Sequence, residues 1–355
     1  MAKILIKNGR VFDGNSFSLS DVFVDGTKIT RLESNITDSA DIIYDAAGKT
    51  VSAGLVDTHV HMRGISSVRF GTQAEMSCFP FGVTAAADAS GVLGDKALLD
   101  SFMVKNVVFV CSKINQNRAD FTNAEKMAEL YGDRVVGIKV YFDSNVADIS
   151  DTTPLEEICK YARKKGWRVM VHSSNSPVTM AKLLGTLDKG DILTHSFHGG
   201  INNASDDDFE SMKDAKKRGV VIDVGFAGNV HTDFAVLRGA IEKGVMPDTI
   251  STDITRLSAY LRGGRYGMTM CMSIAKALGM SEEDIFKAVT SNPAKALGKD
   301  SEWGYLKVGG PADIAVFDYT DEGFDLTDKE GNRVKSDKGY RCVLTLSDGQ
   351  VVYKY

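Results

Sequence analysis

Two histidines lie one residue apart at the end of an apolar stretch, in the run Leu55-Val56-Asp57-Thr58-His59-Val60-His61. Because alternate side chains of a β-strand point to the same side, His59 and His61 can reach one point in space. Neutral imidazole is a common ligand of first-row metals, so this pair can begin a divalent metal site. Taken alone, the pair can equally be two polar residues at the end of a strand.

Four further candidates for metal binding accompany short apolar runs of the same kind. Lys139 interrupts the run at residues 135–141, and three other residues each end such a run. These three are His172 after residues 168–171, His195 after residues 191–194 and Asp253 after residues 249–252. Because all of these residues occupy similar places in recurring strands, we expect them to lie together with His59 and His61.

The middle of the chain alternates apolar strands with amphipathic helices. Strands are predicted at residues 55–61, 82–88, 107–111, 135–141, 168–172, 191–195, 220–224 and 249–253. Helices are predicted between several of them, such as 154–165 and 205–218, the latter beginning at a Ser205 cap. Eight such units in about 240 residues are typical of a closed (β/α)₈ TIM barrel, whose chemistry lies at the carboxyl ends of the strands. The alternative is a doubly wound open sheet, although the chain has no Gly-x-Gly-x-x-Gly turn to favour it.

Both ends of the chain are predicted to form short strands and tight turns, and neither end carries enough apolar residues for a core of its own. We therefore expect residues 1–50 and 303–355 to pair into one small β-sandwich domain. The TIM barrel would then comprise residues 51–302.

The composition narrows the class of function. The chain has 355 residues, of which 43% are hydrophobic, which is enough for a large core. A formal net charge of -5 provides no basic surface for nucleic acid, and no apolar run reaches membrane-spanning length. A small-molecule substrate and a cytoplasmic location are expected, whereas homo-oligomer formation is left open. The five cysteines are widely spaced without a Cys-x-x-Cys pair, which favours reduced thiols.

Together these candidates can form a centre for two divalent metal ions. A lysine held among apolar residues beside such ions is driven toward its neutral amine, which can add carbon dioxide to become an anionic carbamate. A carbamate at Lys139 can bridge two ions. The remaining ligands would be His59, His61 and Asp253 on one ion, with His172 and His195 on the other. A water shared by the ions becomes a strong nucleophile, and Asp253 is placed to accept its proton, so the pattern predicts hydrolysis of an acyl bond.

The same segments resemble the amidohydrolase superfamily over essentially the whole chain. The matching features are the segment 54–61, the strand lysine, the two later histidines, the strand-eight aspartate, and the segments 290–298 and 309–313. The resemblance implies a hydrolase with two metal ions, usually zinc, and an N6-carboxylysine at Lys139. Within the superfamily the chain is most similar to a dihydroorotase-like group of deacetylases, whose members are often named dihydroorotase or adenine deaminase.

The expected reaction is therefore deacetylation, at an amide or ester bond, of a small substrate that bears a carboxylate. The alternatives are a cyclic amidohydrolase of the dihydroorotase or hydantoinase kind, an adenine deaminase-like enzyme, a mononuclear deaminase and a non-catalytic barrel scaffold. The complete ligand set argues against a scaffold, and the strand lysine argues against a mononuclear site. The chain departs from the group at Phe226, where a histidine is expected soon after Asp-Val-Gly, and at Ile254-Thr255, where none follows Ser-Thr-Asp.

Four more residues are candidates for substrate binding. Arg63 matches the arginine with which dihydroorotases hold a substrate carboxylate, but it can instead be a loop cation paired with a nearby acid. Tyr141, two residues after Lys139, can bind an oxyanion or serve only in packing. His198 and His231 lie in loops that follow strands, where they can face the substrate or support a neighbouring group. The glycine-rich segment 262–267 is a candidate lid or anion-binding loop.

Overall fold

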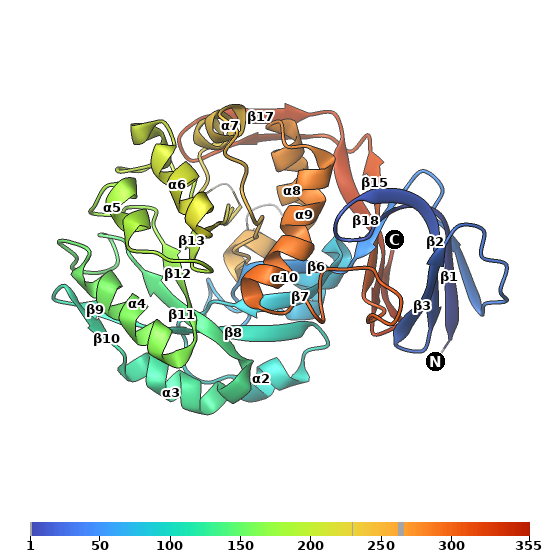
Figure 1. The fold of residues 1–355 in the computed structure, drawn as a ribbon, viewed down its shortest axis with the longest axis horizontal. Coiled ribbons are helices and arrows are strands. Elements are labelled where there is room, and N and C mark those ends of the chain that lie inside the picture. Colours follow the sequence, from blue (N-terminus) through green and yellow to red (C-terminus); the bar gives the residue numbers. More distant parts are fainter. Residues whose placement is uncertain (1, 229, 262–265) are drawn as a thin grey trace.

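A parallel seven-stranded sheet forms the centre of the molecule in the computed structural model, which describes residues 2–228, 230–261 and 266–355 (Figure 1). In sheet order its strands are β6 (Leu55–Val60), β7 (Val83–Asp88), β8 (Lys105–Cys111), β11 (Val135–Tyr141), β12 (Arg168–His172), β13 (Ile192–Thr194) and β14 (Val221–Ile222). β6 and β7 are buried along their whole length, as expected of parallel strands covered on both faces. Most of the glycine-rich candidate loop, residues 262–265, lies outside the described residues.

Residues 249–254 take the place of the eighth strand and close the sheet into a barrel. The closing contacts are two isolated parallel bridges, Asp223 with Thr249 and Val60 with Ile254. The amide of Asp253 also donates to the carbonyl of His59 at 2.8 Å. The TIM barrel predicted from the sequence is confirmed, but its eighth strand is irregular because Asp253 has a left-handed φ of 47°.

Helices cover the outside of the barrel (Figure 1). In the described ranges, no helix is long and apolar enough to cross a membrane. The α-helices are α1 (Ala74–Cys78), α2 (Lys96–Ser101), α3 (Thr122–Tyr131), α4 (Thr153–Lys165), α5 (Met180–Gly185), α6 (Glu210–Arg218), α7 (Phe234–Glu242), α8 (Met268–Ala277), α9 (Glu282–Val289) and α10 (Ser291–Leu297). Short 3₁₀ turns span Phe79–Phe81, Gly132–Arg134 and Ala204–Asp207, and a π-helical turn spans Leu257–Leu261. The helix predicted at 154–165 is confirmed as α4, which buries Leu155, Ile158 and Ala162.

The single helix predicted at residues 205–218 is wrong, because the chain forms the 3₁₀ turn at 204–207 and then α6. Asp208 and Phe209 separate the two with left-handed φ values of 54° and 64°. This turn buries the Phe209 side chain, so packing of one aromatic residue outweighs the local preference for a continuous helix. The predicted cap is also wrong, since the side chain of Asn203 accepts the amide of Ser205 at 2.9 Å.

Strands from both termini join in one mixed eight-stranded sheet, which confirms the small β domain expected from the two ends (Figure 1). Its strands are β1 (Lys3–Phe12), β2 (Phe17–Asp25), β3 (Lys28–Glu33), β4 (Ile42–Asp45), β5 (Thr50–Ala53), β15 (Ile314–Thr320), β18 (Gly339–Ser347) and β19 (Gln350–Lys354). The two terminal segments share one hydrophobic core, which includes Ile6, Val24, Ile314 and Leu346. Neither segment supplies the whole of this core.

Two short hairpins stand outside these sheets. One is formed by β9 (Lys113–Asn115) and β10 (Arg118–Asp120), and the other by β16 (Phe324–Thr327) and β17 (Arg333–Ser336). β17 lies against α8 and runs from the side of α7 back toward the terminal sheet, which it does not join (Figure 1). The carboxyl-terminal part of the chain thus reaches back over the barrel.

Candidate metal centre

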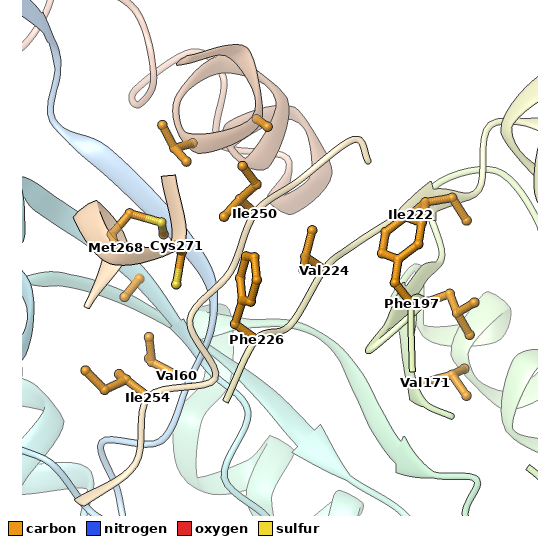
Figure 2. Packing of buried hydrophobic residues seen from close by; sticks show 14 of the residues in the cluster. Val60, Val171, Phe197, Ile222, Val224, Phe226, Ile250, Ile254, Met268 and Cys271 are labelled. Carbon is orange, nitrogen blue, oxygen red and sulfur yellow. The ribbon is translucent and has the colours of Figure 1, made fainter. Parts of the chain in front are cut away.

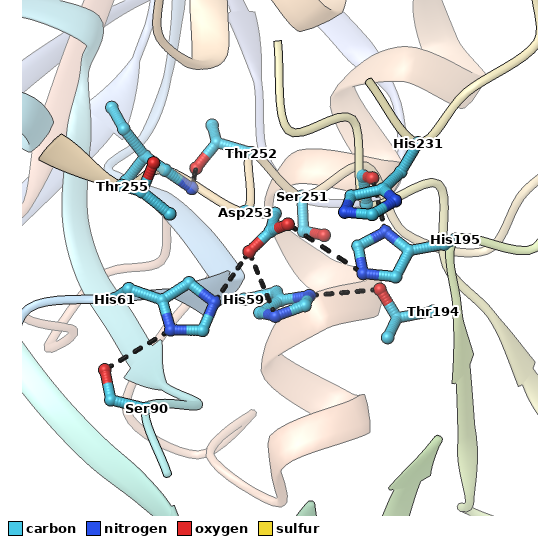
Figure 3. A network of polar contacts seen from close by, with 12 residues as sticks. His59, His61, Ser90, Thr194, His195, His231, Ser251, Thr252, Asp253 and Thr255 are labelled. Atoms are coloured by element: carbon cyan, nitrogen blue, oxygen red, sulfur yellow. Dashed lines mark hydrogen bonds and ion pairs between the residues drawn. The ribbon is translucent and has the colours of Figure 1, made fainter. Parts of the chain in front are cut away.

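His59, His61 and Asp253 meet where the first and last barrel segments adjoin (Figure 3). The Oδ1 of Asp253 lies 2.7 Å from Nε2 of His61 and 3.2 Å from Nε2 of His59. All three side chains are buried, and their nearest ligand atoms lie within 4.8 Å of one another. This grouping agrees with the first predicted ligand set.

A second group consists of His172, His195 and His231, whose ligand atoms also lie within 4.8 Å of one another. The ring of His195 lies 4.5 Å from that of His172 and 4.2 Å from that of His231, measured between centroids. Nε2 of His195 is 3.8 Å from Oδ2 of Asp253, so this carboxylate joins the two groups. The geometry places His231, which the sequence offers only as a substrate-binding candidate, among the candidate metal ligands.

Lys139 lies on β11 between these groups and is fully buried. Its Nζ is 3.2 Å from Nε2 of His59. Burial lowers the pKa of Lys139 to about 8, although the charge of Asp253 opposes that shift. An amine that loses its proton more readily than an ordinary lysine is the chemical starting point that a carbamate requires.

Hydrogen bonds at the rear of two histidines decide which ring nitrogen faces the centre. The hydroxyl of Thr194 donates to Oδ2 of Asp223 at 2.7 Å, so it accepts from Nδ1 of His59 at 3.1 Å. Nδ1 of His195 donates to the carbonyl of Gly225 at 2.7 Å. Both rings therefore carry their proton on Nδ1 and present the Nε2 lone pair to the centre, as metal ligands do.

His172 is held differently, because its Nε2 donates to Oδ2 of Asp143 at 3.2 Å and leaves Nδ1 for the centre. Burial alone would raise the pKa of Asp143, but hydrogen bonds from His172, Asn145 and Asn175 lower it to about 2. Nδ1 of His231 lies 3.0 Å from the Ser174 hydroxyl, which leaves its Nε2 as the second potential ligand atom. Each histidine of the second group is thus oriented by a neighbouring group.

Two of the candidate ligands have strained backbone conformations. His195 has a φ of 58° and Asp253 a φ of 47°, a region that costs a residue other than glycine about 1–3 kcal/mol. Gly225 allows the close approach, since a Cβ at this position would lie 2.6 Å from Nδ1 of His195. The surrounding hydrogen bonds hold both residues in these conformations, which favours a functional role for them.

The donor set fits divalent metal ions. Nε2 of His195 is buried without a hydrogen-bond partner in the described structure, and Oδ1 of Asp253 approaches two imidazoles without an aligned hydrogen bond. Burial would raise the pKa of Asp253, but favourable electrostatic contacts with His59 and His61 hold it below its ordinary value. Neutral imidazoles around an ionised carboxylate match the nitrogen and oxygen ligands that zinc takes in proteins.

Arg63 does not face this centre. Its guanidinium is fully buried, pairs with Oδ1 of Asp88 at 3.0 Å and donates to the carbonyls of Ser90 and Val92. Arg63 is therefore paired with a nearby acid, the second of the two roles considered from the sequence. Its side chain connects the loops that follow β6 and β7.

The other substrate-binding candidates lie nearer to the ligands. The ring of Tyr141 is 5.4 Å from that of His172, and Nζ of Lys139 is 5.7 Å from the Tyr141 ring centroid. His198 is buried and accepts the amide of Gly200 at Nδ1, 3.2 Å away. Phe226 is buried in an apolar cluster with Ile250 (Figure 2).

Several supporting residues have no distinctive signal in the sequence. Asp143 and Ser174 each lie two residues after the end of a strand, a position that many polar residues occupy. Thr194 has no signal except that it directly precedes the candidate His195. A cavity of about 670 Å³ lies elsewhere, around Arg168 and Val221 at the amino ends of β12 and β14. Barrel enzymes work at the opposite ends of their strands, so this groove is not the candidate site.

Comparison with known proteins gives a consistent result. The model of the amidohydrolase family matches residues 105–353, which is more than half of the chain. A deacetylase of Enterococcus faecalis is 28% identical over 98% of both chains, and a dihydroorotase of Streptococcus thermophilus is 24% identical over 99% of this chain and 100% of its own. A solved adenine deaminase structure, 25% identical, superposes with a TM-score of 0.86 over 99% of both chains. The chain therefore belongs to the amidohydrolase family, and it is a hydrolase.

Proposed function

We propose that this hydrolase is a binuclear metal-dependent deacetylase that cleaves an acyl amide or ester bond of a small, carboxylate-bearing substrate. The observation that carries the proposal is the pair of three-residue ligand groups joined through Asp253, with the buried amine of Lys139 beside them. The deacetylase relative supports the reaction class, because it matches the chain over nearly its full length.

The two groups would hold one zinc ion each, and Lys139 as an N6-carboxylysine would bridge them. The ligands would be His59, His61 and Asp253 for one ion, and His172 and His195, with His231 in reach, for the other. When bound, such ions acidify a water and polarise a substrate carbonyl.

Asp253 would act as the proton shuttle. Its depressed pKa keeps it ionised at neutral pH, so one carboxylate oxygen can accept the proton of the attacking water and transfer it to the leaving group. The strained backbone and the contacts to His59 and His61 restrict where that carboxylate can move. Asp253 is therefore the proposed catalytic residue of the chain.

Tyr141 is proposed to stabilise the oxyanion that develops on the substrate. Burial raises the pKa of its phenol, so the hydroxyl stays a hydrogen-bond donor across the neutral range. Its ring lies beside His172, a predicted ligand of the second ion, and beside Lys139, the predicted bridge between the ions. With its ring 5.4 Å from that of His172, the Tyr141 hydroxyl would donate to the carbonyl oxygen of a bound acyl group.

Hydrolysis of a cyclic amide is the second candidate. It is supported by relatives named dihydroorotase and by a solved dihydroorotase structure that shares the fold with a TM-score of 0.86. The buried pairing of Arg63 with Asp88 weighs against it, because this removes the arginine expected to hold a dihydroorotate carboxylate.

The decisive experiment is a substrate panel with the zinc-loaded protein supplied with bicarbonate. The panel contains N-acetyl and O-acetyl acids, dihydroorotate and adenine, and the Asp253→Asn variant is the control. We expect acetate release from at least one acyl acid, which the variant loses. Turnover of dihydroorotate alone would favour the cyclic amidohydrolase, turnover of adenine alone would favour a deaminase, and no turnover at all would contradict the proposal.

A further inference from the structure

The hairpin of β16 and β17 brings its tip, residues 328–332, to the loops that carry His198 and His231. Asp328 is buried, and its Oδ2 accepts the amide of Phe234, the first residue of α7, at 2.7 Å. The side chain of Asn332 donates to Oδ1 of Asp233, the cap of the same helix, at 3.0 Å. Because Asp233 follows His231 by two residues, these bonds fix the tip relative to the second ligand group.

The tip also packs closely on the loop after β13. A Cβ at Gly199 would lie 2.7 Å from Cγ of Glu330 and 2.5 Å from Oδ2 of Asp233, so the backbone and the tip approach as closely as glycine permits. Between them is a cavity of about 60 Å³, lined by His198, His231, Lys329 and Glu330 among others. The cavity therefore connects the hairpin of the carboxyl-terminal segment with a candidate metal ligand.

His198 presents an unused donor in this cavity wall. The amide of Gly200 donates to its Nδ1, so the neutral ring carries its proton on Nε2. Within the described part of the chain, that Nε2 is buried and has no hydrogen-bond partner. A buried N–H without an acceptor is costly, and a substrate oxygen in the cavity would relieve that cost.

Lys329 supplies a positive charge beside that donor. The nearest acid is Glu330, whose Oε1 lies 3.9 Å from Nζ of Lys329, and both side chains are substantially exposed. A pair this long and exposed contributes little, so an incoming anion can compete for the ammonium. Asp233, the other acid at the cavity, accepts two amides of α7 and the side chain of Asn332 at its Oδ1, so this oxygen is directed to the helix.

We propose that His198 and Lys329 form the subsite that binds the carboxylate of the substrate. This subsite takes the place that Arg63 cannot fill, since Arg63 is buried against Asp88. The inference rests on the proposed function for the identity of the substrate. It assigns specificity to the hairpin tip, so a residue from the terminal segment selects what the barrel hydrolyses.

The test measures binding without turnover. Levulinate is the ketone isostere of N-acetylglycine and cannot be deacetylated, and levulinamide differs from it in lacking the negative charge. Isothermal titration of the zinc-loaded protein should give a roughly tenfold preference for levulinate, the scale of one charge-assisted contact. Lys329→Met should reduce the preference to about twofold or less, and the matched control Lys335→Met, an exposed lysine of the same hairpin, should keep it.

His198 is tested in the same assay. His198→Phe should lose most of the preference, whereas His198→Gln, whose side-chain amide can still donate, should retain more of it. A wild-type protein that does not prefer levulinate, or a Lys329→Met variant that keeps the preference, would overturn the inference. Acetate release is scored separately, so a protein with the levulinate preference but no deacetylation would refute the proposed function and leave the subsite standing.

Discussion

Replacing Lys139 by methionine should have opposite effects on stability with and without metal. The fully buried amine has a pKa of about 8 against an ordinary value of 10.5. At 1.36 kcal/mol for each pKa unit, holding the protonated amine in the folded protein costs about 3 kcal/mol at pH 7. Lys139→Met removes this cost, so the metal-free variant should be more stable than the metal-free wild type. With an unfolding entropy near 2.1 cal/mol/K for each residue, its Tm should rise by about 4 °C.

The sign of the pH dependence provides a second check. Between about pH 8 and 10.5, the unfolded chain still holds the lysine proton that the folded protein has released, so the stability of the metal-free wild type increases with pH in this window. Lys139→Met lacks that contribution, and its advantage should shrink toward zero near pH 10.5. Thermal melting of both proteins in chelator, from pH 7 to 10.5, measures the difference. The exposed-lysine control Lys160→Met should follow the wild type.

Zinc and bicarbonate should reverse the order. The shifted pKa makes about 9% of the amine neutral at pH 7, compared with ~0.03% at the ordinary value, so carbamate formation is favoured by a factor of about 300. The wild type should then bind the ions and become the more stable protein, whereas Lys139→Met should bind them weakly and lose activity. A metal-free variant that melts below the wild type at pH 7, or a variant with full activity, would refute this reasoning.

The remaining predictions concern the other ligands. Elemental analysis of the protein saturated with zinc and bicarbonate should find about two ions per chain, and a single ion would contradict the binuclear centre. Asp253→Asn keeps a coordinating oxygen but cannot accept a proton, so metal should be retained while kcat falls by roughly 10²-fold or more, and near wild-type turnover would exclude the shuttle. Thr194→Val removes the acceptor behind His59, and chelator competition should show zinc affinity reduced by about 10–100-fold, whereas an unchanged affinity would assign Thr194 a packing role. His231→Phe should weaken one of the two ions selectively, and loss of neither ion would place His231 outside the coordination shell.

The sequence predicts those parts of the site in which local pattern and spatial position coincide. Parallel strands end at one edge of a barrel, so a polar residue that ends an apolar run is placed there by topology alone. This reasoning brings together His59, His61, His172, His195 and Asp253, as the structure has them. The ligand assignment to individual ions stays a prediction.

The parts that the sequence could not predict depend on contacts between distant segments. The burial of Phe209 interrupts a helix that is locally favourable, and the pairing of Arg63 with Asp88 turns a candidate substrate ligand inward. His231 reaches the second group through an irregular loop, and the hairpin tip with Lys329 lies over the barrel through bonds to α7. None of these positions follows a strand or helix period, so pattern reasoning has no means of locating them.

The irregular closing segment also determines when the candidate metal site is complete. Thr252 bonds to Asp57 across a sequence separation of 195 residues, and Asp253 meets His59 at the same seam. During synthesis, His59 and His61 emerge long before the carboxylate of Asp253 that completes their group. A ligand that binds only the native state stabilises that state, and here the full ligand set exists only in the closed ring. Capture of the first ion would therefore stabilise the closed barrel at the joint between β6 and residues 249–254.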